Sequence, residues 1–195
     1  MTLDLFFEPK SIAVIGASRS PTKAGGVVMD NLLKFNYPGK IYPINPKADE
    51  IQGLKSYSSV NDVKEEIDLA IVVVPAKIVN KVVEDCGKKG IKNAVVLSGG
   101  FSEIGEIERE KELKRVAKKH GIRIIGPNCV GILDTHAKID AMFLPKYRMA
   151  KPIKGKVSLL TQSGAVGATC VDWAARMLQQ DSSLFCLESI CSSTF

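Results

Sequence analysis

Small, flexible and basic side chains suited to phosphate chemistry gather in residues 11–26. A short apolar run over residues 12–15 stops at Gly16, and the residues that follow are small or polar and include Arg19, Lys23 and two adjacent glycines. A loop of this kind between a strand and a helix leaves backbone N–H groups directed at one point, where they can bind an anion. The sequence therefore predicts a phosphate-binding loop.

This loop departs in two ways from the G-x-G-x-x-G pattern of nicotinamide dinucleotide sites. Ser18 stands where that pattern has the glycine that permits close approach of a pyrophosphate. The next predicted strand, residues 40–44, is followed by Lys47, whereas NAD sites have an acidic residue there that binds the ribose diol. A lysine favours a phosphate on the adenosine ribose, which both NADP and coenzyme A carry.

Short apolar runs alternate with amphipathic segments along most of the chain. The expected strands are residues 12–15, 40–44, 68–74, 94–97 and 123–125, and the clearest expected helices are residues 76–89 and 106–120. This alternation is typical of an α/β fold with a Rossmann-like, doubly wound parallel sheet, whose right-handed crossovers bring the carboxyl ends of the strands to one edge. Ligands bind at that edge, so we expect the loops after the strands to form one crevice.

We expect two domains, residues 1–150 and residues 151–195. The first would be complete, and residues 151–155 read as a linker. One strand and one helix cannot enclose a core, so the second would be only the incomplete start of an α/β domain of the flavodoxin-like kind. From about residue 181 the chain loses its strand–turn rhythm, which suggests a truncation or a frameshift.

The second segment repeats the strand–loop–helix order of the first. We expect a buried strand over residues 157–160 and a helix over residues 165–178, with an apolar face that includes Val166, Val171 and Trp173. Between residues 129 and 154 no element is predicted.

Composition limits the function further. The 195 residues are 45% hydrophobic and 25% charged, which supports a globular core, and the net charge of +6 suits an anionic ligand. The basic residues are scattered, so no nucleic-acid face is expected. No apolar run reaches the roughly 18 residues of a membrane span and no signal sequence is visible, which favours the cytosol. The five cysteines form no C-x-x-C pair, so neither a metal site nor disulfides are expected.

Six motifs in order resemble those of the NDP-forming acyl-CoA synthetases, which include the ADP-forming acetyl-CoA synthetases and, more distantly, the α subunit of succinyl-CoA synthetase. They are FFEPKSIAVIGAS at residues 6–18, YPINPK at 42–47, VVVPA at 72–76, LSGGFSE at 97–103, GIRIIGPNCVGI at 121–132 and GKVSLLTQSGAVGA at 155–168. Because they follow one another over most of the chain, they are far more specific than a single glycine loop.

The resemblance implies that the first domain binds coenzyme A or an acyl-CoA through its rim loops. The implied contacts are Gly16, Ala17, Ser18 and Arg19 to the phosphates or adenosine, Lys47 to a phosphate, Val74, Pro75 and Ala76 to the adenine side, and Ser98, Gly99, Gly100 and Glu103 along the pantetheine path. Ser163 and Gly164 match a loop that binds phosphate in the second domain of the family.

The resemblance also implies a reaction in which acyl-CoA, phosphate and ADP interconvert with acid, coenzyme A and ATP. The family passes phosphate through a histidine downstream of the TQSG motif, whereas His120 and His136 both precede that motif. We therefore assign no catalytic residue and expect this chain to bind coenzyme A without turnover. ADP or ATP and magnesium would serve only the complete enzyme.

Partners and alternatives stay open at this point. The family implies an ATP-grasp partner domain or subunit, and an exposed sheet edge could also produce a homo-oligomer. Two other functions are compatible with the sequence: an NADP-binding oxidoreductase domain, and a non-enzymatic module that senses coenzyme A or a nucleotide. The acyl group is not specified by any residue.

Overall fold

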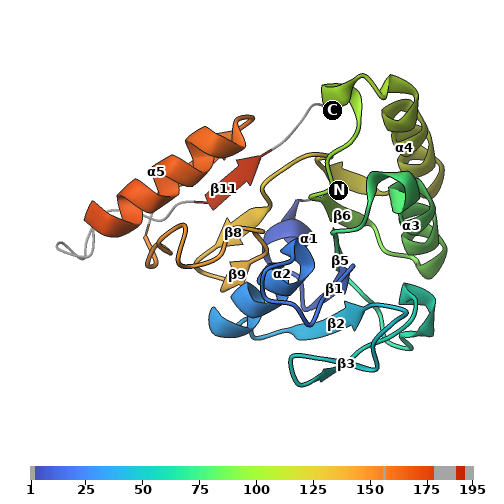
Figure 1. The fold of residues 1–195 in the computed structure, drawn as a ribbon, viewed down its shortest axis with the longest axis horizontal. Helices are drawn as coiled ribbons and strands as arrows, with labels where there is room; N and C mark the ends of the chain where they lie inside the picture. Colours follow the sequence, from blue (N-terminus) through green and yellow to red (C-terminus); the bar gives the residue numbers. More distant parts are fainter. Residues whose placement is uncertain (1–2, 156, 178–187, 192–195) are drawn as a thin grey trace.

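The computed structural model describes residues 3–155, 157–177 and 188–191, and its centre is a five-stranded sheet (Figure 1). The strands are β1 (Ser11–Ile15), β2 (Lys40–Ile44), β5 (Leu69–Val72), β6 (Asn93–Val96) and β7 (Arg123–Ile125). Their spatial order is β2-β1-β5-β6-β7, and every neighbouring pair is parallel. This confirms the predicted doubly wound sheet. The order reverses between β1 and β5, which makes the carboxyl ends of these two strands the topological switch point.

Helices cover both faces of the sheet, with α3 and α4 together on one side in Figure 1 and α2 on the other. The helices of this unit are α1 (Asp4–Phe7), α2 (Ala24–Lys34), α3 (Ala76–Lys89) and α4 (Ile107–His120). Both α3 and α4 end at a glycine in the left-handed conformation, as the sequence predicts.

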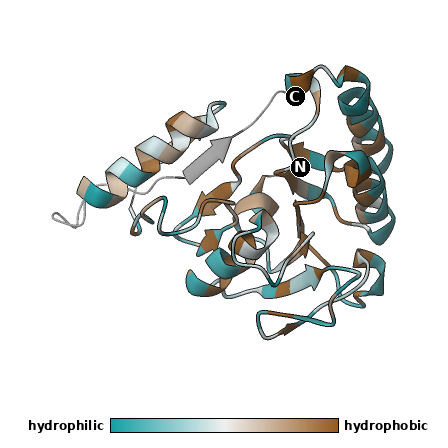
Figure 2. Cartoon of the chain, in the orientation of Figure 1, coloured by the Kyte–Doolittle hydropathy of each residue, from teal (hydrophilic) through white to brown (hydrophobic). Residues whose placement is uncertain are grey.

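Strand β1 shows why the centre of the sheet is apolar on both faces. Ala13 and Ile15 point into the core under α3 and α4, whereas Ile12 and Val14 point into the core under α2, and all four are buried. Figure 2 shows the result as apolar strands between helices whose outer faces are hydrophilic. A strand covered on both faces needs apolar residues at every position, and this explains the unbroken run at residues 12–15.

Two small features lie between β2 and β5. Strands β3 (Glu50–Ile51) and β4 (Leu54–Lys55) form a hairpin, and η1 (Val60–Asp62) is a 3-10 turn capped by Ser59. A second 3-10 turn, η2 (Ser102–Ile104), precedes α4.

A second sheet has the order β10-β11-β8-β9. Its strands are β8 (Ile132–Asp134), β9 (Ile139–Asp140), β10 (Ser158–Thr161) and β11 (Glu188–Cys191). The expectation of no element between residues 129 and 154 is therefore wrong. Strands of two or three residues are too short to show an alternating pattern, and β8 is held by antiparallel pairing with β11, more than fifty residues later. The division at residue 150 stays a prediction.

The predicted burial of the second segment is partly wrong. In β10 exposed and half-buried residues alternate, and Leu160 is 68% exposed. In α5 (Gly164–Met177), Val171 is buried as expected, but Val166 and Trp173 are more than half exposed. Among the described residues, a hydrophobic cluster that includes Leu133 packs against this strand and helix and covers one side of them. The predicted change of pattern from about residue 181 falls mostly on residues outside the described part.

Candidate functional site

The switch point brings together the segments that follow β1 and β5, and Gly16 is the point of contact. Gly16 has a φ of +93°, and a Cβ atom there would lie 2.2 Å from the carbonyl oxygen of Val73. Glycine alone among the amino acids meets both requirements without strain. The loop over residues 16–23, here called the glycine loop, is thereby held against the end of β5.

The next two glycines serve helix packing. The sequence places Gly25 and Gly26 in the loop, but α2 begins at Ala24, so both lie in its first turn. A Cβ atom on Gly25 would lie 2.0 Å from the carbonyl oxygen of Gly16, and one on Gly26 would lie 1.9 Å from that of Ser20. The first turn of α2 therefore packs directly on the glycine loop, at a distance that no other residue permits.

Helices α2 and α3 begin at the switch point without caps. In their described first turns neither helix has an acidic residue, and the N-cap residues Lys23 and Pro75 make no side-chain capping bond. By contrast, α4 has Glu108 and Glu110 in its first turn. Uncapped helix N-termini carry unsatisfied N–H groups and partial positive charge. Two of them at one switch point provide a site for an anion such as a phosphate group.

The predicted contact residues of the glycine loop differ in their exposure and in the hydrogen bonds that they already make. Ala17 is fully buried, and its carbonyl oxygen is engaged by Asn45, whereas the half-buried Ser18 accepts a hydrogen bond from the Ser20 N–H at 3.1 Å. Arg19 is exposed and its Nε donates to the Glu50 carbonyl oxygen at 3.0 Å. The Arg19 guanidinium is thereby held beside the loop.

Lys47 lies next to the glycine loop because of a residue that sequence reasoning missed. Asn45 Oδ1 accepts from the Lys47 N–H at 2.8 Å, and Asn45 Nδ2 donates to the Ala17 carbonyl oxygen, also at 2.8 Å. The Lys47 side chain is exposed at this position. The signal was present in the sequence, since an asparagine before Pro46 is typical of a side-chain-stabilised turn.

The loops after β5 and β6 also lie together. Ser98 Oγ donates to the Val74 carbonyl oxygen at 2.6 Å. Gly100 has a φ of +107°, and a Cβ atom there would lie 2.8 Å from that of Ala76. Among the predicted contact residues of these loops, Pro75, Gly99 and Glu103 are exposed. Six of the predicted residues thus lie at the carboxyl ends of β5 and β6: Val74, Pro75, Ala76, Ser98, Gly99 and Gly100.

Glu103 orders the loop in which it lies. Its carboxylate accepts hydrogen bonds from the N–H groups of Gly100 and Phe101, and the Arg109 guanidinium donates to the Gly100 carbonyl oxygen. Partial burial acts to raise the pKa of Glu103, but the backbone N–H groups outweigh it and hold this pKa below its ordinary value. Arg109 was not predicted, because nothing in the pattern of α4 separates it from the surface arginines.

The predicted phosphate loop of the second segment adjoins the last rim loop. A Cβ atom on Gly164 would lie 2.3 Å from Cγ2 of Val130, so the start of α5 packs against the segment that follows β7. Ser163 Oγ accepts from the Val166 N–H at 3.4 Å. Asn128 in the same rim segment donates its N–H to the Ser98 carbonyl oxygen at 3.0 Å, which connects this region to the loop after β6.

The two histidines lie elsewhere. His120 ends α4, at the opposite edge of the sheet from the rim, and its ring packs against Gly87 of α3. His136 Nε2 lies 2.9 Å from the Gly155 carbonyl oxygen. Among the described residues no group of three or more His, Cys, Asp or Glu side chains could hold a metal ion.

A groove of about 720 Å³ lies along the outer edge of β7. Phe6, Phe7, Ile124 and Leu160 are among its lining residues, and none of the predicted site residues is. Its walls are mainly apolar, and Lys114, Lys118 and Arg123 also line it. The candidate site is therefore an open surface made by loops, separate from this groove.

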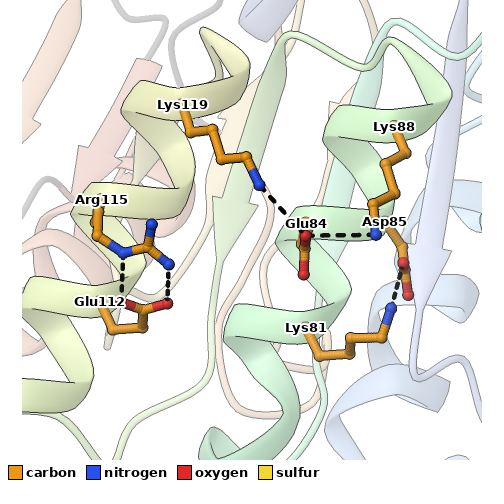
Figure 3. A network of polar contacts seen from close by, with 7 residues as sticks. All are labelled: Lys81, Glu84, Asp85, Lys88, Glu112, Arg115 and Lys119. Carbon is orange, nitrogen blue, oxygen red and sulfur yellow. Dashed lines mark hydrogen bonds and ion pairs between the residues drawn. The ribbon is translucent and has the colours of Figure 1, made fainter.

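The outer faces of α3 and α4 carry charges of both signs in close pairs (Figure 3). The residues drawn are Lys81, Glu84, Asp85, Lys88, Glu112, Arg115 and Lys119. Exposed pairs of this kind contribute at most about 1 kcal/mol each. Seven of the ten lysines and arginines on these helices lie in ion pairs of this kind. No described helix is long and apolar enough to cross a bilayer.

The comparisons with known proteins agree with this geometry. The chain is 54% identical over 166 residues to an ADP-forming acetate–CoA ligase of Methanocaldococcus jannaschii, covering 85% of this chain and 23% of the relative. It is 50% identical over 171 residues to the α subunit of ADP-forming acetate–CoA ligase II of Pyrococcus furiosus, covering 87% and 36%. Both relatives bear out the resemblance to the ADP-forming acyl-CoA synthetases.

The fold has a solved counterpart as well. Acetyl-coenzyme A synthetase 1 of Ca. Korarchaeum cryptofilum, determined with phosphate and ADP, superposes with a TM-score of 0.86 at 40% identity. The match covers 97% of this chain and 39% of that one. This chain therefore spans well under half the length of the proteins it resembles. Residues 10–135, which hold the rim loops up to the end of β7, match the family described as the CoA binding domain, and the chain belongs to that family.

Proposed function

We propose that the rim loops bind coenzyme A and that this domain serves an acid–CoA ligase of the ADP-forming type. The observation that carries the proposal is the pair of uncapped helix N-termini at the switch point, where Gly16, Gly25 and Gly26 leave no room for a side chain. A cradle lined by backbone N–H groups suits the pyrophosphate of coenzyme A.

Each segment has a proposed part of the ligand. The glycine loop and the first turn of α2 take the pyrophosphate, with Arg19 beside it, and Lys47 supplies a point charge for the phosphate on the ribose. Val74, Pro75 and Ala76 offer a half-apolar surface for adenine, and the segment from Ser98 to Glu103 guides pantetheine. Coenzyme A supplies the thiol that accepts the acyl group.

The proposed reaction interconverts acyl-CoA, phosphate and ADP with acid, coenzyme A and ATP. The names of both relatives support this reaction, but both relatives are much longer than this chain. Nucleotide, magnesium and the phosphate relay are therefore assigned to a partner domain or subunit, and Ser163 with Gly164 to a phosphate. The proposed compartment is the cytosol, because the buried Cys86 and the half-buried Cys170 form no disulfide.

Isothermal titration of the chain tests the proposal. We expect saturable binding of coenzyme A, with a dissociation constant that rises with ionic strength because phosphate contacts are screened. NADPH, which also carries a ribose phosphate, is the matched competitor. Binding of NADPH without binding of coenzyme A would instead support an oxidoreductase domain.

A further inference from the structure

One side-chain amide joins the two segments proposed to hold phosphate groups. Asn45 follows β2 and is half-buried. Its Nδ2 donates to the Ala17 carbonyl oxygen in the glycine loop, and its Oδ1 accepts from the N–H of Lys47. Both bonds are 2.8 Å long, well within good hydrogen-bond geometry. One side chain therefore bonds directly to both the glycine loop and Lys47.

The β3–β4 hairpin adds one bond to the same loop and one to the first turn of α2 that follows it. The Glu50 carbonyl oxygen accepts from Arg19, and Gln52 Nε2 donates to the Gly26 carbonyl oxygen at 3.0 Å. Gln52 has a φ of +51°, as the two-residue turn of this hairpin requires. The segment after β2 thus holds the glycine loop at both of its ends, with Asn45 nearest to β1.

Asparagine is suited to this place because its amide both donates and accepts. The donated bond satisfies the carbonyl oxygen of the buried Ala17, which would otherwise lack a partner from this side chain. The accepted bond closes the turn that directs Lys47. An aspartate could keep the second bond, but it would set a carboxylate oxygen against the Ala17 carbonyl oxygen.

We propose that Asn45 is a positioning residue that sets the spacing between the glycine loop and Lys47, and so gives the site its preference for coenzyme A over 3′-dephospho-coenzyme A. The inference rests on the proposed function. Asn45 acts through Lys47 and the loop, without a contact of its own to the ligand.

The test compares the two ligands by isothermal titration for the wild-type chain and for the variants Asn45→Ala, Asn45→Asp and Lys47→Ala. We expect the wild-type chain to bind coenzyme A more tightly than the dephospho form. Each variant should weaken coenzyme A binding about tenfold, the effect of one lost hydrogen bond to a charged group, and bring the ratio of the two dissociation constants toward one. The double variant Asn45→Ala, Lys47→Ala should lose little more than Lys47→Ala alone, because the two residues act as a unit.

Matched controls separate positioning from stability and from charge. Asn36→Asp makes the same substitution at an exposed residue at the other end of α2, and should change neither affinity. Asn45→Asp is isosteric and covers the case in which Asn45→Ala does not fold. If folded Asn45→Ala or Asn45→Asp keeps the wild-type ratio of the two dissociation constants, the inference is overturned. It is also overturned if only Asn45→Asp weakens coenzyme A binding, because charge repulsion alone would explain that result. Failure of the wild-type chain to bind coenzyme A would overturn the proposed function itself.

Discussion

Replacing Gly26 with alanine should damage the candidate site more than the fold. The new Cβ atom would lie 1.9 Å from the Ser20 carbonyl oxygen and 3.1 Å from that of Ser18, whereas ordinary contact begins at 3.4 Å. Relief of the closer contact therefore requires a shift of about 1.5 Å between α2 and the glycine loop. A shift of this size separates the N–H groups of the helix from those of the loop.

Two effects oppose each other in the stability of this variant. Alanine in a helix is favoured over glycine by about 0.8–1.0 kcal/mol, whereas overpacking typically costs about 1–3 kcal/mol. We expect a net loss of up to about 2 kcal/mol, which lowers Tm by up to about 8 °C for a domain of this size. Binding should suffer more, because each lost hydrogen bond to a charged group costs about 1.5–3 kcal/mol, equivalent to about tenfold to hundredfold in affinity.

Calorimetric titration with coenzyme A and a thermal melt measure both effects on the same sample. Gly121→Ala is the matched control: Gly121 ends α4 at the opposite edge of the sheet, has a φ of +63° and faces open space. Its alanine variant should lose about 1–2 kcal/mol through backbone strain and bind coenzyme A normally. Unchanged affinity in a folded Gly26→Ala chain would refute the assignment of the cradle.

Other parts of the molecule give independent predictions. Lys151→Met should destabilise the chain by about 3–5 kcal/mol in urea unfolding, because it removes the ammonium that lies 2.7 Å from the buried Asp140 carboxyl. Adding Asp140→Asn should recover much of this loss. Equal stability of the single and double variants would contradict the prediction. Glu103 should titrate by carbon NMR below its ordinary value of 4.5. Because the folded pKa is lowered, its bonds to Gly100 and Phe101 stabilise the fold above the unfolded pKa, and this contribution is lost as the pH falls through the folded pKa. A normal or raised midpoint would show that these bonds do not persist in solution.

The central sheet could be predicted because its signals are local. The run over residues 12–15 is apolar at each position since helices cover both faces, and Gly90 and Gly121 end helices where a left-handed residue is needed. The rim loops follow from that topology, whereas the individual contact residues within them are implied by the family resemblance and stay a prediction.

The remainder depends on contacts that no local pattern records. Strands β8 and β9 exist through pairing with distant residues, and Trp173 is exposed because helical periodicity does not say which neighbours are present. Asn45 and Arg109 act through carbonyl oxygens of other loops, which one sequence does not reveal. Gly26 was assigned to a loop because a glycine pair is typical of a turn, whereas here it permits close packing of a helix.

Amide chemical-shift mapping with coenzyme A tests the central claim most directly. Titration of the isotope-labelled chain should shift the backbone N–H signals of the non-proline residues of the glycine loop, of Lys47, of Val74, Ala76 and Lys77, and of residues 98–101, with one common dissociation constant. Signals from the apolar groove along β7, such as those of Phe7 and Ile124, should stay in place. Saturable shifts confined to that groove, with the rim loops unmoved, would contradict the account.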